Sequence, residues 1–443
     1  MFFVVVCVAL VLASGFTSEG GKKRTLYGLT DALDRGYLKR DGQELYYEVR
    51  GKRANAPVAL WLHGGPGAGC FPNHARFFNP DKWRVCLIDQ RGCGRSTPEG
   101  QLEGNNTPKL VEDLEALRAL IMDDEPWDCV LGGSWGSTLA LAYAGTHPHN
   151  MRSIVLRGVC AMRTKEIRWL FSPKGGAATL APHAYRDFAS FAEGETKNGL
   201  GLEDDDDEDR VLRYYHDALK GDDQSQREEA ARHWMCWESQ ANGVASRRGN
   251  TRRFGGTTGD APQPVAHQAP TQAKKPEAPV SPTTSYLDDL DRQQKQARQQ
   301  KMRVFAQPLL TSYYSLHRGF FDEDTCIMNQ ANIDAIRHIP AIAVQGGADL
   351  ICPPTTAFEL HTKWPELQLR LVPGAGHSQY DPDITHELIE ATDDITLLLE
   401  EQEAAARKKR KEDAKKKKNS GESSRPASDT SRGVEEGFIR RMC

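Results

Sequence analysis

Short apolar runs recur along the chain, and each leads into a glycine or a polar turn. They span residues 58–62, 85–88, 129–131, 154–156, 342–344 and 369–372. Runs of this length and apolarity predict buried strands of a mostly parallel sheet. Two further runs, 37–39 and 45–49, flank Asp41-Gly42 and predict a β-hairpin.

Helix-like patterns lie between several of these runs, and residues 110–122 carry apolar positions at helical spacing among acids. This alternation predicts an α/β fold, a mostly parallel sheet flanked by helices. From about residue 163 to residue 319 the strand pattern stops, and aromatic, charged helical segments predict a helical cap inserted in the sheet domain. Within it, residues 243–303 are rich in Gln, Pro, Thr and Lys and predict a disordered, low-complexity insertion.

Composition and charge extend the predicted domain organisation to the two ends of the chain. The expected parts are a sheet core over 24–160 and 326–400, a cap over 161–325, and a basic disordered tail over 401–443. The tail is a solvated segment without assigned function, although a basic run can also be a nuclear signal or a phosphate-binding patch. The net charge of −4 favours no nucleic-acid partner.

The compartment stays open at this point. Residues 2–13 are apolar and too short for a membrane span, and no lysine or arginine precedes them, so residues 1–20 are either a signal peptide or anchor, or a mis-assigned start. The sequon at Asn105 matters only in the secretory pathway. The ten cysteines include no Cys-x-x-Cys pair, which disfavours zinc-binding and thioredoxin-like interpretations.

The sequence Gly132-Gly133-Ser134-Trp135-Gly136 lies between the run at 129–131 and a helix-like segment. This setting predicts a nucleophile elbow, in which a sharp strand-to-helix turn exposes the hydroxyl of Ser134 above the sheet. Glycine-serine turns are common, and a plain loop or a helix N-cap is the alternative.

A serine nucleophile needs a base, a carboxylate that orients the base, and donors for the oxyanion. Asp349 and His377 each follow a predicted strand through glycines, in the chain order Ser, Asp, His. A lone aspartate is more often a helix cap and a lone histidine a surface residue, but the joint order and spacing favour a triad of Ser134, Asp349 and His377. The oxyanion hole is expected at the backbone N–H of Trp135 and in the loop of Gly64 and Gly65.

Further motifs extend this pattern over most of the chain, and they are 63–67 (HGGPG), 89–96 (DQRGCGRS), 132–137 (GGSWGS), 352–354 (CPP) and 374–378 (GAGHS). With them the chain resembles the proline iminopeptidase (prolyl aminopeptidase) family of α/β-hydrolases, from about Gly36 to Asp381. The resemblance implies an α/β-hydrolase core with a helical cap and serine chemistry without metal or cofactor. It implies release of an N-terminal residue, preferably proline, from peptides with a free N-terminus through an acyl-enzyme.

The resemblance also implies substrate-binding residues. Glu238, in a Trp-Glu pair, matches a family carboxylate that holds the substrate ammonium, and Arg157 is placed at the pocket. Thr311 stands where the family has a second glutamate, and Cys160 stands where it often has a phenylalanine against the proline ring. Ala348, before Asp349, departs from the Arg and Tyr usual there. These departures are expected to loosen substrate specificity and to leave the triad intact.

The resemblance further implies a cytoplasmic monomer without stable membrane insertion; the alternative is the secretory pathway, if residues 1–18 act as a signal peptide. Two other functions remain open. One is an esterase or broader acyl hydrolase that uses the same triad, and the other is an inactive scaffold on a hydrolase fold. Dehalogenase and epoxide-hydrolase chemistry is disfavoured because those relatives carry an aspartate where this chain has Ser134.

Overall fold

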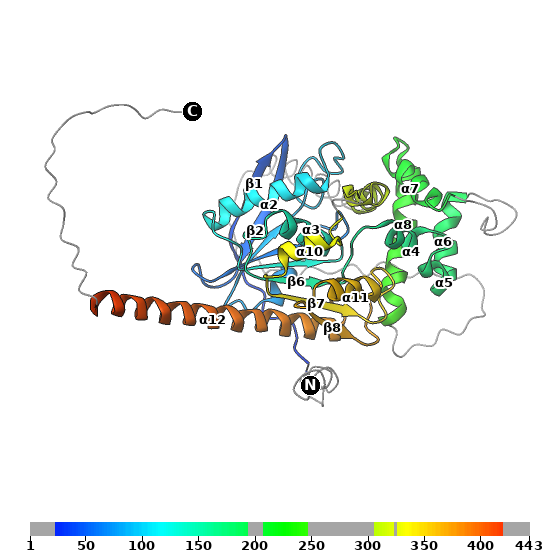
Figure 1. Cartoon of the computed structure of the whole chain (residues 1–443). Coiled ribbons are helices and arrows are strands. Elements are labelled where there is room, and N and C mark those ends of the chain that lie inside the picture. The colour runs from blue at the N-terminus through cyan, green and yellow to red at the C-terminus, as the bar shows by residue number, and fades with distance from the viewer. Residues whose placement is uncertain (1–22, 194–206, 247–304, 323–325, 420–443) are drawn as a thin grey trace, which may run out of the picture. The chain divides into compact units, whose positions relative to one another are not determined.

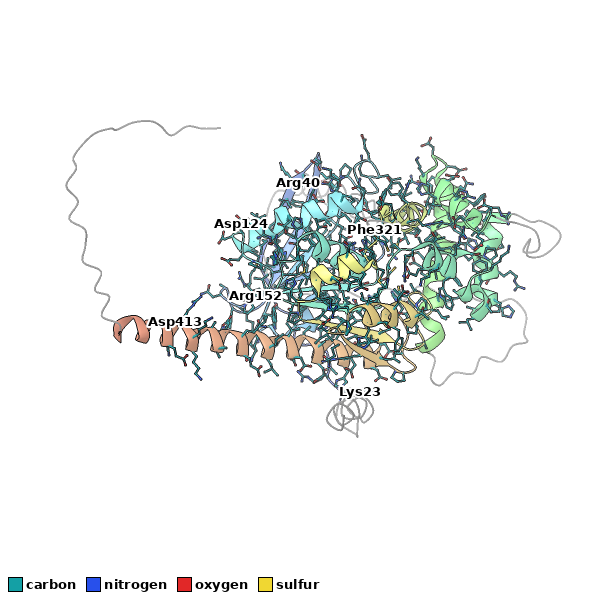
Figure 2. All side chains as sticks on the ribbon, in the orientation of Figure 1. Lys23, Arg40, Asp124, Arg152, Phe321 and Asp413 are labelled. Atoms are coloured by element: carbon teal, nitrogen blue, oxygen red, sulfur yellow. The ribbon has the colours of Figure 1, made fainter. Side chains whose placement is uncertain are left out.

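The computed structural model describes residues 23–193, 207–246, 305–322 and 326–419 (Figure 1). Figure 2 shows the side chains of the described residues, from Lys23 near the N-terminus to Asp413 in the C-terminal helix. The expectations for residues 1–20, and for all but the first four residues of 243–303, fall outside the described residues. The chain divides into two compact units, Met1–Ile395 and Thr396–Cys443, and the sheet and the cap belong to the first.

The first unit is built on an eight-stranded sheet in the order β1-β2-β4-β3-β5-β6-β7-β8. The strands are β1 (Ala32–Arg40), β2 (Gln43–Arg50), β3 (Val58–Leu62), β4 (Arg84–Ile88), β5 (Cys129–Gly133), β6 (Ile154–Arg157), β7 (Ala341–Gly346) and β8 (Gln368–Val372). β1 and β2 form the predicted hairpin, and β2 runs antiparallel to β4. All pairings from β4 to β8 are parallel, so the α/β prediction is confirmed.

Strand register brings the predicted site loops to one edge of the sheet. Leu62 of β3 pairs with Gly132 of β5, and Gly133 pairs with Arg157 of β6. The carboxyl ends of parallel strands meet at the same edge, which is where open α/β sheets bind ligands. The loops after β3, β5, β6, β7 and β8 therefore gather there.

Helices cover the sheet. α2 (Thr107–Met122) begins after Asn106, whose side chain accepts a hydrogen bond from the backbone N–H of Lys109 at 3.0 Å. α3 (Trp135–Thr146) packs against α2 and against β3, β5 and β6, and its Ala/Leu-rich sequence suits burial on nearly all sides. α10 (Gln330–Ile336) contacts α3, and α11 (Pro354–Lys363) packs on β7 and β8.

The cap lies between β6 and β7, as predicted (Figure 1, with α6 to α8 in green). It comprises α4 (Thr164–Phe171), α5 (Gly176–Leu180), α6 (Pro182–Glu193), α7 (Arg210–Lys220), α8 (Gln224–Ser246) and a helix over residues 305–316. Phe188 of α6 stacks on Tyr215 of α7 with ring centroids 4.3 Å apart, and both rings contact Trp234 of α8. α8 runs four residues into the predicted disordered insertion, because its last turns still pack Ala241 in the interior.

The prediction for the tail is corrected over residues 401–419. α12 (Pro382–Asn419) continues through them as a helix. Alanine, lysine, arginine and glutamate are strong helix formers, and Glu403 and Arg407 form an i,i+4 ion pair at 3.5 Å. Over the described residues, no helix combines the length and the apolarity that a membrane crossing requires.

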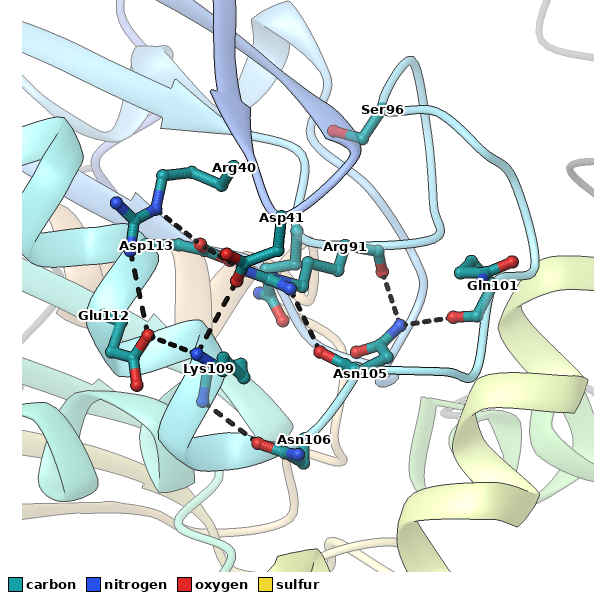
Figure 3. Close-up of polar contacts among 12 residues, drawn as sticks. Arg40, Asp41, Arg91, Ser96, Gln101, Asn105, Asn106, Lys109, Glu112 and Asp113 are labelled. Carbon is teal, nitrogen blue, oxygen red and sulfur yellow. Dashed lines mark hydrogen bonds and ion pairs between the residues drawn. The ribbon is translucent and has the colours of Figure 1, made fainter.

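A buried ion pair fixes the hairpin and α2 to the loop after β4 (Figure 3). Arg91, only 1% exposed, donates two parallel hydrogen bonds to Asp113 at 2.6 and 2.7 Å and a third to Asp41 at 2.9 Å. Asn105, whose amide bonds the carbonyl groups of Arg91 and Gln101, is buried as well. The sequon asparagine is therefore inaccessible in the folded protein.

Candidate active site

Ser134 occupies the turn between β5 and α3 with φ 57° and ψ −128°, a strained conformation for a residue with a side chain. Two glycines make the turn possible. A Cβ on Gly132 would lie 2.0 Å from the carbonyl oxygen of Gly136, and one on Gly136 would lie 2.1 Å from that of Leu62. The turn thus has the geometry of a nucleophile elbow.

His377 and Asp349 meet at the same edge of the sheet. His377 Nδ1 lies 2.7 Å from Asp349 Oδ2, and both residues are buried. Asp349 Oδ1 accepts hydrogen bonds from the backbone N–H groups of Ile351 and Cys352, each at 2.9 Å. These contacts fix the orientation of the carboxylate and hence of the imidazole, so His377 Nδ1 carries the proton and Nε2 is the acceptor.

Ser134 and His377 line one cavity of about 240 Å³. Among the described residues, no hydrogen bond joins the two directly: Ser134 Oγ lies 3.9 Å from Cys352 Sγ, and His377 Nε2 accepts a hydrogen bond from Arg157 Nη1 at 3.0 Å. Catalytic hydrogen bonds often tighten only in the complex with substrate. Ser134 and His377 thus border one cavity, and Asp349 contacts His377 at its edge.

The predicted oxyanion loop lies against the serine. A Cβ on Gly64 would come within 3.1 Å of Ser134 Cβ, and Gly65 adopts a φ of 110° that favours glycine. Trp135 is the first residue of α3, so its backbone N–H is one of the helix's unpaired donors. Both parts of the predicted oxyanion hole thus flank Ser134.

Gln90 contacts both segments of the predicted oxyanion hole, and the sequence analysis did not identify it. Its Oε1 accepts a hydrogen bond from the indole N–H of Trp135 at 2.8 Å, and its Nε2 donates to the carbonyl oxygen of His63 at 3.0 Å. The buried side chain therefore bridges the two segments that are predicted to form the oxyanion hole. The available signal was its place in the motif at 89–96.

Glu238 of α8 lines the same cavity as Ser134 and His377. Its two carboxylate oxygens accept hydrogen bonds from Trp234 Nε1 and Gln307 Nε2, both at 2.8 Å. Burial raises the pKa of Glu238 to about 7, although both hydrogen bonds favour the charged form. No ion pair joins Glu238 to a basic side chain in the described parts of the chain.

Cys160 and Thr311 line a second, smaller cavity of about 60 Å³, which also borders Ser134 and Cys352. Thr311 Oγ1 donates a hydrogen bond to the carbonyl oxygen of Pro66 at 3.0 Å. The hydroxyl therefore ties the helix over 305–316 to the oxyanion loop. This contact could not be read from the sequence, since the two segments are far apart in the chain.

Two more residues contact members of the predicted triad. A Cβ on Gly158, whose φ is 56°, would lie 3.1 Å from the imidazole of His377, so this position favours glycine. Gln345 of β7 donates to Asp349 Oδ2 at 3.4 Å and to the Cys352 carbonyl oxygen at 2.9 Å. Nothing in the sequence marked Gln345, which follows an apolar run. Within the described residues, no group of three or more His, Cys, Asp or Glu side chains is placed to hold a metal ion.

The fold and the elbow place this chain in the α/β-hydrolase class, and residues 57–383 match the family model described as alpha/beta hydrolase fold. The chain is 37% identical over 378 residues to the proline iminopeptidase of Arabidopsis thaliana, covering 85% of this chain and 83% of that one. It is 34% identical over 371 residues to that of Neisseria gonorrhoeae, covering 84% and 98%. A probable proline iminopeptidase of Leptolyngbya boryana is 35% identical over 349 residues, covering 79% and 89%. The chain belongs to the proline iminopeptidase family.

Proposed function

We propose that the protein is a serine aminopeptidase that releases an N-terminal residue, preferably proline, from peptides. The observation that carries the proposal is the Asp349–His377 pair at 2.7 Å beside the cavity that also holds Ser134 and Glu238. Membership of the proline iminopeptidase family supports it.

In the first half of the reaction, Ser134 Oγ attacks the scissile carbonyl carbon and His377 Nε2 accepts its proton. Asp349 keeps the imidazole oriented, and the backbone N–H groups of Trp135 and the loop of Gly64 and Gly65 stabilise the oxyanion. His377 then protonates the leaving amine. In the second half, water activated by His377 hydrolyses the acyl-enzyme and releases the N-terminal residue.

Glu238 accounts for the exopeptidase specificity of the proposed reaction. A carboxylate beside the nucleophile, with neutral donors as its only partners among the described residues, can pair with a substrate ammonium and fix the position of the first residue. Thr311 supplies no second charge, so we expect the grip on the ammonium to depend on Glu238. The small cavity beside Cys160 suits a small N-terminal residue such as proline.

A panel of chromogenic amides tests the proposal. We expect prolyl amide to be cleaved fastest, alanyl amide more slowly, and N-blocked prolyl amide hardly at all, because the blocked substrate lacks the ammonium. Equal cleavage of the blocked substrate would contradict aminopeptidase action, and much faster cleavage of short acyl esters would favour an esterase.

A fluorophosphonate probe tests the nucleophile. We expect the wild type to be labelled and Ser134→Ala to be unlabelled, with a loss of activity of about 10³-fold or more. Folded wild-type protein that resists labelling would favour a scaffold instead.

A further inference from the structure

Arg157, the last residue of β6, is a buried cation without a carboxylate partner. It is 7% exposed, and among the described residues no ion pair joins it to an aspartate or glutamate. Its Nε has no hydrogen-bond partner, and its Nη1 donates to the carbonyl oxygen and to Nε2 of His377 at 2.9 and 3.0 Å. Burying an unpaired guanidinium is unfavourable, so its retention calls for a function.

The position of Arg157 separates it from the acyl pocket. It lines the larger cavity, together with Ser134, His377 and Tyr380, and not the smaller one that Cys160 and Thr311 line. If the smaller cavity holds the N-terminal residue, the larger one receives the leaving group. Arg157 then faces the part of the substrate that follows the scissile bond.

Glu238 supplies the complementary charge. It lines the same larger cavity, and it too lacks an ion pair among the described residues. A buried cation and a half-buried carboxylate, neither of which has an oppositely charged partner among the described residues, thus border one cavity that Ser134 also lines. The positive charge of Arg157 and the negative charge of Glu238 complement the carboxylate and the ammonium of a zwitterionic ligand.

We propose that Arg157 binds the C-terminal carboxylate of the substrate and that the enzyme therefore favours free dipeptides. This inference rests on the aminopeptidase function proposed above. In a dipeptide, standard backbone dimensions put the carboxylate carbon roughly 3–4 Å from the scissile carbonyl carbon. That distance keeps the carboxylate within the cavity that Arg157 and Ser134 share.

Binding of the carboxylate also affects the base. Arg157 Nη1 donates to His377 Nε2, the atom that must accept the proton of Ser134. A carboxylate is a stronger acceptor for a guanidinium than a neutral imidazole is. A dipeptide therefore draws the guanidinium away and frees Nε2, so the free acid gains in kcat as well as in KM.

The test compares prolyl-alanine with prolyl-alanine amide, which differ only in the terminal carboxylate, by measuring released proline. For the wild type we expect kcat/KM to be about 10- to 100-fold higher for the free acid. Arg157→Gln should bring the ratio close to one, by reducing activity on the acid and, because Nε2 of His377 loses its guanidinium donor, by raising activity on the amide. Arg152→Gln, a change at an exposed arginine just before β6, is the matched control and should keep the wild-type ratio.

The outcomes separate the inference from the function on which it rests. Equal cleavage of both substrates by the wild type would overturn the role of Arg157 and leave the aminopeptidase intact, whereas no cleavage of either would reject the aminopeptidase. An equal loss on both substrates in Arg157→Gln would also overturn the inference. If that variant fails to fold, Arg157→Lys keeps the charge but loses the two-pronged geometry, and an acid preference unchanged from wild type would overturn it.

Discussion

Two buried arginines of this protein are treated in opposite ways. Arg91 forms two parallel hydrogen bonds with Asp113 and a third with Asp41 in the cluster of Figure 3. Among the described residues, Arg157 forms hydrogen bonds only with the imidazole and the carbonyl oxygen of His377. Burial lowers the pKa of both, but the bonds with Asp113 and Asp41 raise that of Arg91 above its usual range, whereas that of Arg157 stays lowered.

The difference teaches how to tell a structural charge from a functional one. A buried charge that supports the fold is neutralised within the fold, because the desolvation penalty must be offset at all times. A buried charge left unpaired beside a nucleophile is stabilised only when a ligand of opposite charge arrives. Breaking the first should change stability, and breaking the second should change substrate preference.

The largest effect is expected at Arg91. Arg91→Met removes both short hydrogen bonds of buried Asp113 and leaves it the longer ion pair with Arg40 at 3.6 Å, so the free energy of unfolding should fall by about 3–5 kcal/mol. Urea unfolding followed by tryptophan fluorescence measures this. The double variant Arg91→Met/Asp113→Leu is the control and should recover most of the loss, since it removes both charges. A single variant as stable as wild type would contradict the structural role of the pair.

The next effect concerns Glu238, the carboxylate of the cavity that has no basic partner among the described residues. Because its pKa is about 7, it is protonated below that pH and cannot pair with an ammonium, so kcat/KM for prolyl amide should rise with pH through about 7. Glu238→Gln should lower the plateau by about 10- to 100-fold and remove this component of the profile. The control is hydrolysis of a short acyl ester, which has no ammonium and reports the remaining groups. Superimposable profiles for wild type and Glu238→Gln on prolyl amide would refute the assignment.

A smaller effect is expected at Cys160 in the acyl pocket. Cys160→Phe fills part of the small cavity with a ring, and we expect it to raise the ratio of prolyl to alanyl cleavage by about 10-fold. Initial rates on the two amides measure the ratio. Cys236→Ala, at an exposed thiol of α8, is the control. A ratio that falls in Cys160→Phe would place the proline ring elsewhere.

The smallest effect is on the stability of the Arg157 variant. Arg157→Met removes an unpaired buried charge, so the free energy of unfolding should stay within about 1 kcal/mol of wild type or increase. The measurement is the same urea titration as for Arg91→Met. A loss as large as that at Arg91 would show that both arginines support the fold and would remove the contrast between them.

Much of the fold was predictable because local patterns carry it. Each apolar run became a strand, and the glycines around Ser134 marked a turn that no other residue fits. The bridging role of Gln90 could not be predicted, because it depends on which distant backbone groups come within reach. The lack of a carboxylate partner for Arg157 among the described residues was equally hidden, since a sequence does not show which carboxylates lie near a given charge.

The helix over residues 305–316 has a consequence for how selectivity can change over evolutionary time. Gln307 on this helix bonds Glu238, and Thr311 one turn later bonds the carbonyl oxygen of Pro66 beside Gly65. The same helix therefore contacts both Glu238, which we assign to binding the substrate ammonium, and the loop that we assign to stabilising the oxyanion. We expect mutations that shift the helix to alter substrate range and turnover together. Descendants of this enzyme should therefore acquire new substrates more readily by changing side chains on the helix than by moving the helix.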